Sequence, residues 1–353
     1  MKIGVNARLL QEKHHTGIQS YIKNLYQAIG HIDQKNEYIF LKNRHENSLL
    51  KNVLYDNFLI KKQIKKFQID LFHAPNTILP LGTKKCPYIA TVHDLGFKVL
   101  PQMGKKTDIA YLNFAFKNIT KKADVIITDS FAVKKEIKKY YPIKESRLKV
   151  IPLGVDNFYF EKESQKYLQK TKEQYQLDNQ KIIFTNSAHS SRKNIGLLTK
   201  MFTQNRHYFK NTFLIICGLI NKDAFQNIIS NNKEDNILLL GYVSKRKLRA
   251  FYQIADIFIY PSLYEGFGLP LLEALASNTL VLASNIPAFK EIITDNNLFF
   301  DPLREDDVFE KTKYYLNISH SKKEIIVGGY QKILEKLTWL KAAEKMINIF
   351  NSF

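Results

Sequence analysis

The sequence of 353 residues is poor in cysteine, which argues against two classes of protein. Its only two cysteines, Cys86 and Cys217, lie far apart in apolar runs that resemble strands. They provide neither the disulfide framework of a small secreted domain nor the spacing of a zinc motif. We therefore expect two buried structural thiols in a reducing compartment.

The sequence also lacks a long apolar run. The run Phe213–Ile220 is far shorter than the roughly 20 residues that cross a bilayer. The first residues, MKIGVNARLL, have no charged leader, apolar core or cleavage site of a signal peptide and instead predict a strand. We expect a cytoplasmic protein, with peripheral attachment to the inner face of the cytoplasmic membrane as an open alternative.

Acidic residues are scarce: 33 Asp and Glu stand against 53 Lys and Arg, for a net charge of +20. Much of the excess lies in the first half, in clusters that begin at Lys61, Lys117 and Lys134. Three explanations remain open, namely a composition rich in Lys, Asn and Ile, an anionic membrane surface, and nucleic acid. No nucleic-acid motif of defined geometry is present, so we expect no nucleic-acid partner.

The length favours two domains, because one hydrophobic core stops growing at roughly 250–300 residues. Short β-branched or apolar runs alternate with helical patterns in both halves, which predicts parallel sheets with helices on both faces. The fold class is therefore α/β, with two doubly wound domains. We place the first domain at residues 1–160, the second at 161–335 and a C-terminal helix at 336–353.

Strands are predicted at 2–6, 38–42, 56–60, 70–74, 88–94, 124–130 and 148–154 in the first half, and at 181–187, 213–218, 236–241, 256–262, 280–285 and 298–302 in the second. The main helices are predicted at 18–30, 107–120, 132–140, 194–203, 223–231, 245–251 and 270–277. Ligands of doubly wound sheets bind outside the carboxyl ends of the strands, so polar residues directly after strands are the first candidates for a site.

Arg192 and Lys193 follow the first strand of the second domain and are expected to open a helix. Two cations beside the free amides of a helix N-terminus favour an anion, best of all a phosphate. The alternative is a solvated surface pair.

Glu265 and Glu273 flank a later turn from strand to helix. Pro270 suits the first helical turn, and the amides of Gly268 and Leu269 would point at a ligand. Each carboxylate can accept hydrogen bonds from the hydroxyls of one sugar, and a nucleotide sugar carries two sugars joined by a diphosphate. Alternatively, Glu273 is an acid that the helix dipole favours in the first turn.

The first domain has weaker candidates. Gly17 can bring the backbone at the start of the first helix close to a phosphate, and Tyr21 lies one turn further along. His93 and Asp94 end a strand, and His93 is either a contact of a sugar hydroxyl or leaving oxygen, or a structural histidine. Ser130 begins a helix, as a ligand contact or as an N-cap.

Several familiar motifs are missing. There is no Asp-x-Asp motif for a metal and a diphosphate, no Gly-x-Gly-x-x-Gly after the first strand and no Walker loop. We therefore expect neither a metal nor a cofactor, with Arg192, Lys193 and backbone amides neutralising the diphosphate.

The ordered motifs resemble those of the retaining, nucleotide-sugar-dependent glycosyltransferases of family four. EGFGLPLLEALAS is similar to that family's pair of glutamates with seven residues between them, and SRKN to its Arg-Lys site for the donor phosphates. Further blocks match in order over nearly the whole chain: TGIQSY, DLFHAPNTILP, TVHDLGF, TDSF, VIPLGVD, ASNIPAFKEI, LFFDP and LTWLKAAEKMI. One departure is Ser187-Ala188, where the family often has Gly-Thr. The likeness is greatest to the mannosyltransferase-like branch that builds bacterial surface polysaccharides.

The resemblance implies a GT-B fold, in which two Rossmann-like domains face a cleft and the C-terminal helix crosses back to the first domain. It implies that Arg192 and Lys193 hold the diphosphate and that Glu273 binds the ribose of the donor. It further implies that Glu265 binds the transferred hexose, together with the backbone of Phe267, Gly268 and Leu269.

The resemblance also implies that Gly17 and His93 reach the donor from the first domain. We count Glu265, His93, Arg192 and Lys193 as catalytic. Tyr21, Asp94 and Ser130 are expected on the acceptor side.

For the reaction, the resemblance implies transfer of a hexose with retention and without a metal, the leaving phosphate acting as base. GDP-mannose is the favoured donor, and the acceptor is a saccharide or is linked to lipid. Three alternatives stay open: a nucleotide-sugar epimerase of the same fold, a phosphorylase, for which no pyridoxal lysine motif is present, and a non-catalytic basic protein that binds membrane or nucleic acid.

Overall fold

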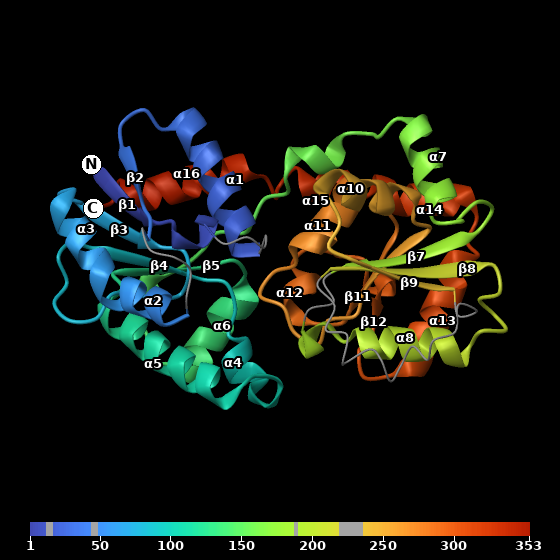
Figure 1. Cartoon of the computed structure of the whole chain (residues 1–353), viewed down its shortest axis with the longest axis horizontal. Helices are drawn as coiled ribbons and strands as arrows, with labels where there is room; N and C mark the ends of the chain where they lie inside the picture. The colour runs from blue at the N-terminus through green and yellow to red at the C-terminus, as the bar shows by residue number, and fades with distance from the viewer. Residues whose placement is uncertain (12–16, 44–48, 187–189, 219–235) are drawn as a thin grey trace. The chain divides into compact units, whose positions relative to one another are not determined.

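The computed structural model describes residues 1–11, 17–43, 49–186, 190–218 and 236–353, and the chain forms two compact units (Figure 1). Unit 1 comprises Met1–Gly154 and Leu337–Phe353, and unit 2 comprises Val155–Lys336. Each unit contains a six-stranded sheet in which the described strand pairs are all parallel. The predicted α/β class with two doubly wound domains is therefore confirmed.

The sheet of unit 1 has the order β2–β1–β3–β4–β5–β6. The strands are β1 (Lys2–Asn6), β2 (Glu37–Leu41), β3 (Leu71–Ala74), β4 (Tyr88–Val92), β5 (Val125–Thr128) and β6 (Leu148–Val150). The helices are α1 (Gly17–Ile32), α2 (Leu49–Leu54), a π-helical turn (Tyr55–Leu59), α3 (Ile60–Lys66), α4 (Gly96–Val99), α5 (Lys106–Lys122), α6 (Phe131–Tyr140) and, at the end of the chain, α16 (Trp339–Phe350).

Side chains that alternate along the central strands of unit 1 divide its core into two layers. Phe72 and Val92 belong to a cluster that also takes in buried residues of α3, α5 and α6. His73 and Thr91 point to the other face, where α1 and α16 lie side by side (Figure 1). On that face the Tyr26 hydroxyl of α1 lies 2.6 Å from His73 Nδ1, so a polar contact joins helix and sheet.

The sheet of unit 2 has the order β12–β11–β10–β7–β8–β9. Its strands are β7 (Lys181–Asn186), β8 (Thr212–Cys217), β9 (Ile237–Gly241), β10 (Ile257–Tyr260), β11 (Val281–Ser284) and β12 (Phe299–Phe300). Its helices are α7 (Gln165–Gln174), α8 (Ile195–Gln204), α10 (Lys245–Ile254), α11 (Leu269–Ala276), α12 (Pro287–Lys290), α13 (Glu305–Leu316), α14 (His320–Gly328) and α15 (Gln331–Leu334). The helix predicted at 223–231 lies outside the described residues.

The strand predicted at 56–60 was wrong. These residues form the π-helical turn and the start of α3, in one helical run that begins with α2. Tyr55 and Ile60 are buried, whereas Phe58 and Leu59 are exposed, which is one-sided burial around a helix. A short apolar run is compatible with either element, and packing against the sheet decides for the helix.

The chain passes from unit 1 to unit 2 after Gly154, whereas the boundary predicted from the sequence lies after residue 160. Residues 155–160 pack within unit 2, where Arg249 donates from Nη1 to the Phe158 carbonyl at 2.6 Å. Arg249 is buried and also pairs with Glu163 at 2.6 Å, so a charged network fixes this segment to α10.

Among the described residues, no helix combines the length and the apolar character needed to cross a bilayer.

Gly154 lets the two segments of unit 1 approach closely. A Cβ atom at this position would lie 2.1 Å from the backbone nitrogen of Trp339 and 2.4 Å from the carbonyl carbon of Thr338. Backbone atoms move only with the whole of α16. We therefore expect Gly154→Ala to destabilise the protein by about 1–3 kcal/mol, measured as a lower midpoint of thermal unfolding.

Gly30→Ala is the matched control, because Gly30 lies in α1 and a Cβ atom there meets nothing within 4 Å. This change should leave stability unchanged or raise it by about 0.5–1 kcal/mol. Equal midpoints for the two variants would contradict the close approach.

Candidate functional site

Two loops with candidate residues meet in unit 2 because β7 and β10 are neighbours in the sheet. From β7 the chain proceeds to β8 and β9 on one side, and then to β10 on the other side. This reversal is a topological switch point, and ligands of doubly wound sheets bind at such a point outside the carboxyl ends of the strands. Arg192 and Lys193 follow β7, and Glu265 follows β10.

The Glu265 carboxylate joins these two loops. Its Oε2 accepts a hydrogen bond from Arg192 Nη1 at 2.8 Å, and its Oε1 accepts one from Lys193 Nζ at 2.5 Å. Ser262 Oγ and the Tyr260 hydroxyl donate to Oε1 at 2.7 and 3.0 Å. We call these five residues the Glu265 cluster. The carboxylate that was predicted to hold a sugar is thus ion-paired with both cations that were predicted to hold phosphates.

Glu265 keeps its charge although it is only 8% exposed. Burial alone would raise the pKa of this carboxyl group, but Lys193 and Arg192 outweigh burial and lower the pKa to about 2. Arg192, Lys193 and Glu265 together carry one net positive charge. The side chain of Arg192 is 28% exposed, so this charge is accessible to an anion.

The two cations do not lie in the first turn of a helix, as the sequence analysis expected. They belong to a 3-10 turn, Ser191–Lys193, and α8 begins after Asn194, which is left-handed with a φ of 54°. Both cations therefore precede α8, next to its N-terminal end. Ser187 and Ala188, the departure from the family pattern, lie outside the described residues.

The backbone at Gly268 is shaped by its φ of 125°, which only glycine adopts readily. A Cβ atom there would lie 2.8 Å from Cε1 of Phe289, whose ring stacks on Tyr260 at 5.1 Å between centroids. Phe267, the residue before Gly268, is buried. Leu269 is the first residue of α11, where N–H groups have no acceptor within the helix.

Glu273 lies in α11 and has the opposite electrostatic character. The Tyr252 hydroxyl donates to its Oε2 at 3.0 Å, and no cation approaches it as closely as those at Glu265 within the described residues. Burial raises the pKa of Glu273 to about 7, against the smaller opposing effects of Tyr252, Tyr159 and Lys245. One glutamate is therefore a permanent anion, whereas the other changes its charge near neutral pH.

His93 follows β4 of unit 1 and has both ring nitrogens engaged. Nδ1 lies 2.7 Å from Asp129 Oδ2, and Nε2 lies 3.0 Å from the Pro75 carbonyl oxygen. A carbonyl oxygen can only accept, so Nε2 donates to Pro75, and Nδ1 shares a proton with the carboxyl group of Asp129, whose own pKa is raised by burial. Burial opposes a positive charge on His93, but Asp129 outweighs burial and raises the pKa of His93. A substrate oxygen reaches a ring N–H of His93 only by displacing one of these partners.

The remaining candidates of unit 1 have structural contacts. Tyr21 is 2% exposed, with its hydroxyl 3.0 Å from Thr91 Oγ1. Ser130 is fully buried, and its Oγ accepts from the Val133 amide, so the predicted N-cap is confirmed. Asp94 Oδ1 accepts from the Gly96 amide at 2.8 Å and is partly exposed.

Gly17 is the exposed first residue of α1, and a Cβ atom built on it would meet none of the described residues within 4 Å. The role of each candidate toward a ligand stays a prediction.

Sequence analysis missed the residues that support the two glutamates. Tyr260 ends β10 and Ser262 lies two residues further, so the rule that selected Glu265 could have selected them. Tyr252, on α10, carries no such signal, because its apolar neighbours give the pattern of an ordinary core position.

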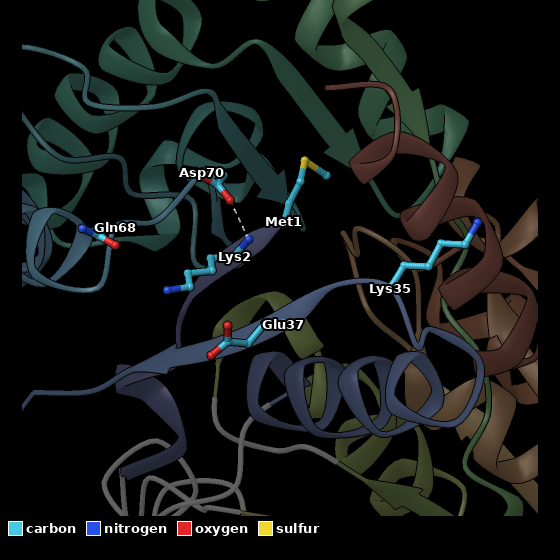
Figure 2. A pocket seen from close by; sticks show the side chains of 6 residues that line it. All are labelled: Met1, Lys2, Lys35, Glu37, Gln68 and Asp70. Carbon is cyan, nitrogen blue, oxygen red and sulfur yellow. Dashed lines mark hydrogen bonds between the residues drawn. The ribbon is translucent and has the colours of Figure 1, made fainter.

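An open pocket of about 390 Å³ lies at the edge of the unit 1 sheet where β1, β2 and β3 begin (Figure 2). It is lined by Met1, Lys2, Lys35, Glu37, Gln68 and Asp70. Its charges are of both signs, and Asp70 Oδ2 already accepts from the Lys2 amide at 2.8 Å. Across the described residues, no group of His, Cys, Asp and Glu is arranged to hold a metal ion.

Comparison with known proteins adds family information to this geometry. Residues 167–332 match the family model described as Glycosyl transferases group 1, and residues 31–157 match Glycosyltransferase Family 4. Together the two matches span most of the chain.

Two relatives and one solved structure illustrate the likeness. The match to O-antigen chain mannosyltransferase B of Escherichia coli has 26% identity over 296 residues and covers 81% of this chain and 75% of that protein. The chain is 30% identical over 216 residues to O-antigen chain mannosyltransferase RfbU of Salmonella typhimurium, or 60% of this chain and 56% of that protein. The crystal structure of Anabaena HepE in complex with UDP-glucose matches with a TM-score of 0.78 at 15% identity, over 100% of both chains. This last likeness shows the fold.

The pKa of Glu273 predicts how stability depends on pH. The folded-state pKa of Glu273, about 7, is above the 4.5 of an ordinary glutamate side chain, so between these values the folded protein holds a proton that the unfolded chain has lost. Stability therefore falls as pH rises through this window. We expect Glu273→Gln, which mimics the protonated group, to reduce the difference in unfolding temperature between pH 5 and pH 8, as measured by calorimetry.

Glu344→Gln, at an exposed position of α16, is the matched control and should retain the difference seen in the unchanged protein. An identical pH dependence in the unchanged protein and Glu273→Gln would show that Glu273 titrates in its ordinary range.

Proposed function

We propose that this chain, which belongs to family four of the glycosyltransferases and has the GT-B fold, moves a hexose from a nucleotide-diphosphate sugar to an acceptor. The acceptor is a saccharide or a lipid-linked saccharide of a bacterial surface polysaccharide, such as lipopolysaccharide, O-antigen or capsule. The anomeric configuration is retained and no metal takes part. Mannose is the favoured hexose and GDP-mannose the favoured donor, because the relatives include O-antigen mannosyltransferases.

The Glu265 cluster at the switch point of unit 2 is the observation that carries this proposal. Arg192 and Lys193 bind the diphosphate, which displaces part of their contact with Glu265. The freed carboxylate oxygens then accept hydrogen bonds from hydroxyls of the hexose, beside the backbone of Phe267, Gly268 and Leu269. Ser262 keeps Glu265 oriented through both states by its hydrogen bond to Oε1. Tyr260 also donates to Oε1, and its hydroxyl accepts from Lys193, so it links the cation to the carboxylate.

Glu273 binds the ribose of the donor in this proposal. Its ionised form accepts from ribose hydroxyls, while Tyr252 holds the carboxylate in place. Gly17, an exposed glycine, is proposed as a contact of the donor, as the resemblance implies. Acceptor contacts belong to unit 1, where Asp94 is the accessible candidate. Tyr21 and Ser130 act there through the backbone and helix positions that they fix.

The chemistry breaks the bond between the anomeric carbon and the diphosphate oxygen and forms a bond from that carbon to the acceptor oxygen. The acceptor proton passes to the leaving diphosphate on the same face of the sugar. Negative charge grows on the diphosphate as the sugar becomes cationic, and fixed cations stabilise that charge without reorganisation.

A thermal-shift screen of nucleoside diphosphates and sugar nucleotides tests the donor directly. Stabilisation by guanosine compounds above uridine compounds supports GDP-mannose, and the reverse order excludes it as the preferred donor. Incubation with the donor alone separates transfer from epimerisation, because an epimerase would form a new sugar nucleotide without an acceptor.

Arg192→Ala or Lys193→Ala should each lower kcat by about 10²–10³, the loss seen when one charge-stabilising donor is removed. Steady-state kinetics with a saturating donor would measure this. Lys200→Ala is the control, because Lys200 is 61% exposed and pairs with Glu305 on the surface. Turnover near that of the unchanged protein in both variants would refute the phosphate role.

Variants of the two glutamates should differ in their affinity for a nucleoside diphosphate that lacks the transferred sugar. Glu273→Ala removes a ribose contact and should weaken binding. Glu265→Ala releases two cations from their ion pairs and should weaken binding less, or even strengthen it. Isothermal calorimetry compares the two dissociation constants. Equal losses would count against the separate roles.

A further inference from the structure

A pocket of unit 2 lies beside β12, the edge strand of its sheet. It measures about 410 Å³, within the roughly 300–1,000 Å³ of pockets that hold small molecules. The turn before β12 and the helices α13 and α14 line it, with side chains that include Asp295, Asn297, Asp307, Tyr314, Tyr315 and Lys322. None of its lining residues belongs to the Glu265 cluster or to α11. We call it the α13–α14 pocket.

Tyr315 brings a hydroxyl group without a partner to this pocket. The residue is only 6% exposed, yet it lines the pocket, and its hydroxyl group has no hydrogen bond within the described part of the chain. Burial raises the pKa of Tyr315 to about 12, so the hydroxyl group keeps its proton and can donate. A polar group that is buried without a partner is costly, which indicates that a bound molecule completes it.

Two carboxylates that line the pocket are fixed through one oxygen each. Asp295 Oδ1 accepts from the backbone and side-chain nitrogens of Asn297, both at 2.9 Å. Asp307 Oδ2 accepts from the Asp301 amide at 2.7 Å. The second oxygen of each carboxylate has no hydrogen bond among the described residues. The lining thus combines oriented acceptors with the buried donor of Tyr315.

An exposed aromatic ring completes the lining, and a lysine holds it. Tyr314 is 50% exposed, and its ring meets that of Tyr315 at 90° with the centroids 5.0 Å apart. Lys322 Nζ of α14 lies 5.0 Å from the centroid of the Tyr314 ring and donates to its hydroxyl group. Lys311 Nζ donates to the Asn297 carbonyl at 2.9 Å. An ammonium group has three N–H donors, so each lysine has capacity for a further acceptor.

This chemistry disfavours most classes of ligand. The carboxylates of Asp295, Asp307 and Glu310 oppose a phosphate or another anion. Within the described ranges, no group of His, Cys, Asp and Glu is arranged to hold a metal ion. Ile326 alone among the described lining residues has an aliphatic side chain, which is little for an apolar ligand.

A saccharide satisfies the same lining. Each of its hydroxyl groups both donates and accepts, so neighbouring hydroxyls can use the carboxylates, the ammonium groups and the tyrosine hydroxyl together. The C–H face of a sugar ring can pack on an aromatic face such as that of Tyr314.

We propose that the α13–α14 pocket binds a saccharide unit, separately from the donor hexose at the Glu265 cluster. Asp295 and Asp307 accept hydrogen bonds from its hydroxyls, and Tyr315 donates to one of its oxygens. Tyr314 covers one face of the ring. In the proposed function, which this use of the pocket rests on, the unit belongs to a saccharide acceptor. A second point of attachment raises the local concentration of the acceptor without taking part in the chemistry.

Saturation-transfer NMR on the full chain tests the binding itself. The probes are methyl α-mannoside, methyl α-glucoside and methyl α-galactoside, and we expect transfer from the protein to at least one of them. The signal should persist in Glu265→Ala, which lacks the carboxylate proposed for the donor hexose. Tyr315→Phe should weaken binding by about three- to tenfold, the loss expected for one hydrogen bond. Tyr314→Ala should weaken it at least as much, because it removes the ring.

Matched controls are available within unit 2. Tyr208→Ala is the control for Tyr314→Ala, because Tyr208 is also 50% exposed and lies outside the pocket lining. Tyr175→Phe is the control for Tyr315→Phe, since Tyr175 is partly buried and likewise outside the lining. Both controls should bind the glycosides as the unchanged protein does, and thermal unfolding checks that every variant is folded.

Kinetics with GDP-mannose and acceptors of two lengths test the use of the pocket. Tyr315→Phe should raise KM for mannotetraose and leave kcat unchanged. Its KM for methyl α-mannoside should stay the same, because one sugar unit cannot occupy two places. A KM that rises equally for both acceptors would overturn the role in acceptor attachment.

Absence of saturation transfer to all three glycosides would overturn the pocket. So would a signal that disappears in Glu265→Ala, which would place the bound sugar at the candidate site, or equal losses in the test and control variants. The two proposals fail separately. Sugar transfer without glycoside binding fails only the pocket, and glycoside binding without transfer from any sugar nucleotide fails only the proposed function.

Discussion

The ion pairs of Glu265 with Arg192 and Lys193 hold the candidate site together, and the parallel pairing of β7 with β10 makes them possible. Lys193 and Glu265 are 72 positions apart in sequence, yet the adjacent parallel strands bring their loops to one edge of the sheet. Removing Glu265 would leave two cations close together without a counter-ion, whereas removing either cation would leave a single ion pair. Within unit 2, the site is therefore an electrostatic unit rather than a set of independent contacts.

The ion pairs within the site affect how a ligand is recognised. A pair of free cations would attract any phosphate, including inorganic phosphate and nucleic acid. Here an anion must compete with Glu265 for both cations, and a ligand that also offers hydroxyls to the displaced carboxylate has the advantage. A sugar attached to a diphosphate can replace both sets of partners, those of the cations and those of the carboxylate. A phosphate without hydroxyls breaks the same ion pairs and offers the carboxylate nothing in return, and this difference gives selectivity.

The sequence predicted the architecture well because both sheets are parallel and buried on both faces. Such strands are continuous apolar runs with polar residues directly after them, as in 181–187 and 256–262, and this pattern is easy to recognise. The strand predicted at 56–60 was wrong because only Ile60 of its three neighbouring apolar residues is buried, whereas Phe58 and Leu59 are exposed. The sequence does not distinguish the buried residue from the exposed ones.

The charged residues of the candidate site were selected from the sequence, whereas the residues that support them were not. Arg192, Lys193, Glu265 and Glu273 stand out because ionisable groups beside a strand end are rare in an apolar context. Tyr260 and Tyr252 do not stand out, since an aromatic residue in a core position needs no further reason. The pairing of His93 with Asp129 and the carbonyl of Pro75 was equally hidden, because it joins the ends of three strands that are close only in the folded sheet.

The return of the chain to unit 1 sets an order of events during synthesis. Chains emerge from the ribosome N-terminus first, and domains usually fold in the same order. Unit 1, however, includes Leu337–Phe353, and α16 packs beside α1 with Phe350 fully buried. Its core is complete only when Leu337–Phe353 has been synthesised, whereas the residues of unit 2 precede that segment. The nascent unit 1 must therefore wait with an uncovered apolar face on its sheet, which is a natural point for a chaperone to act.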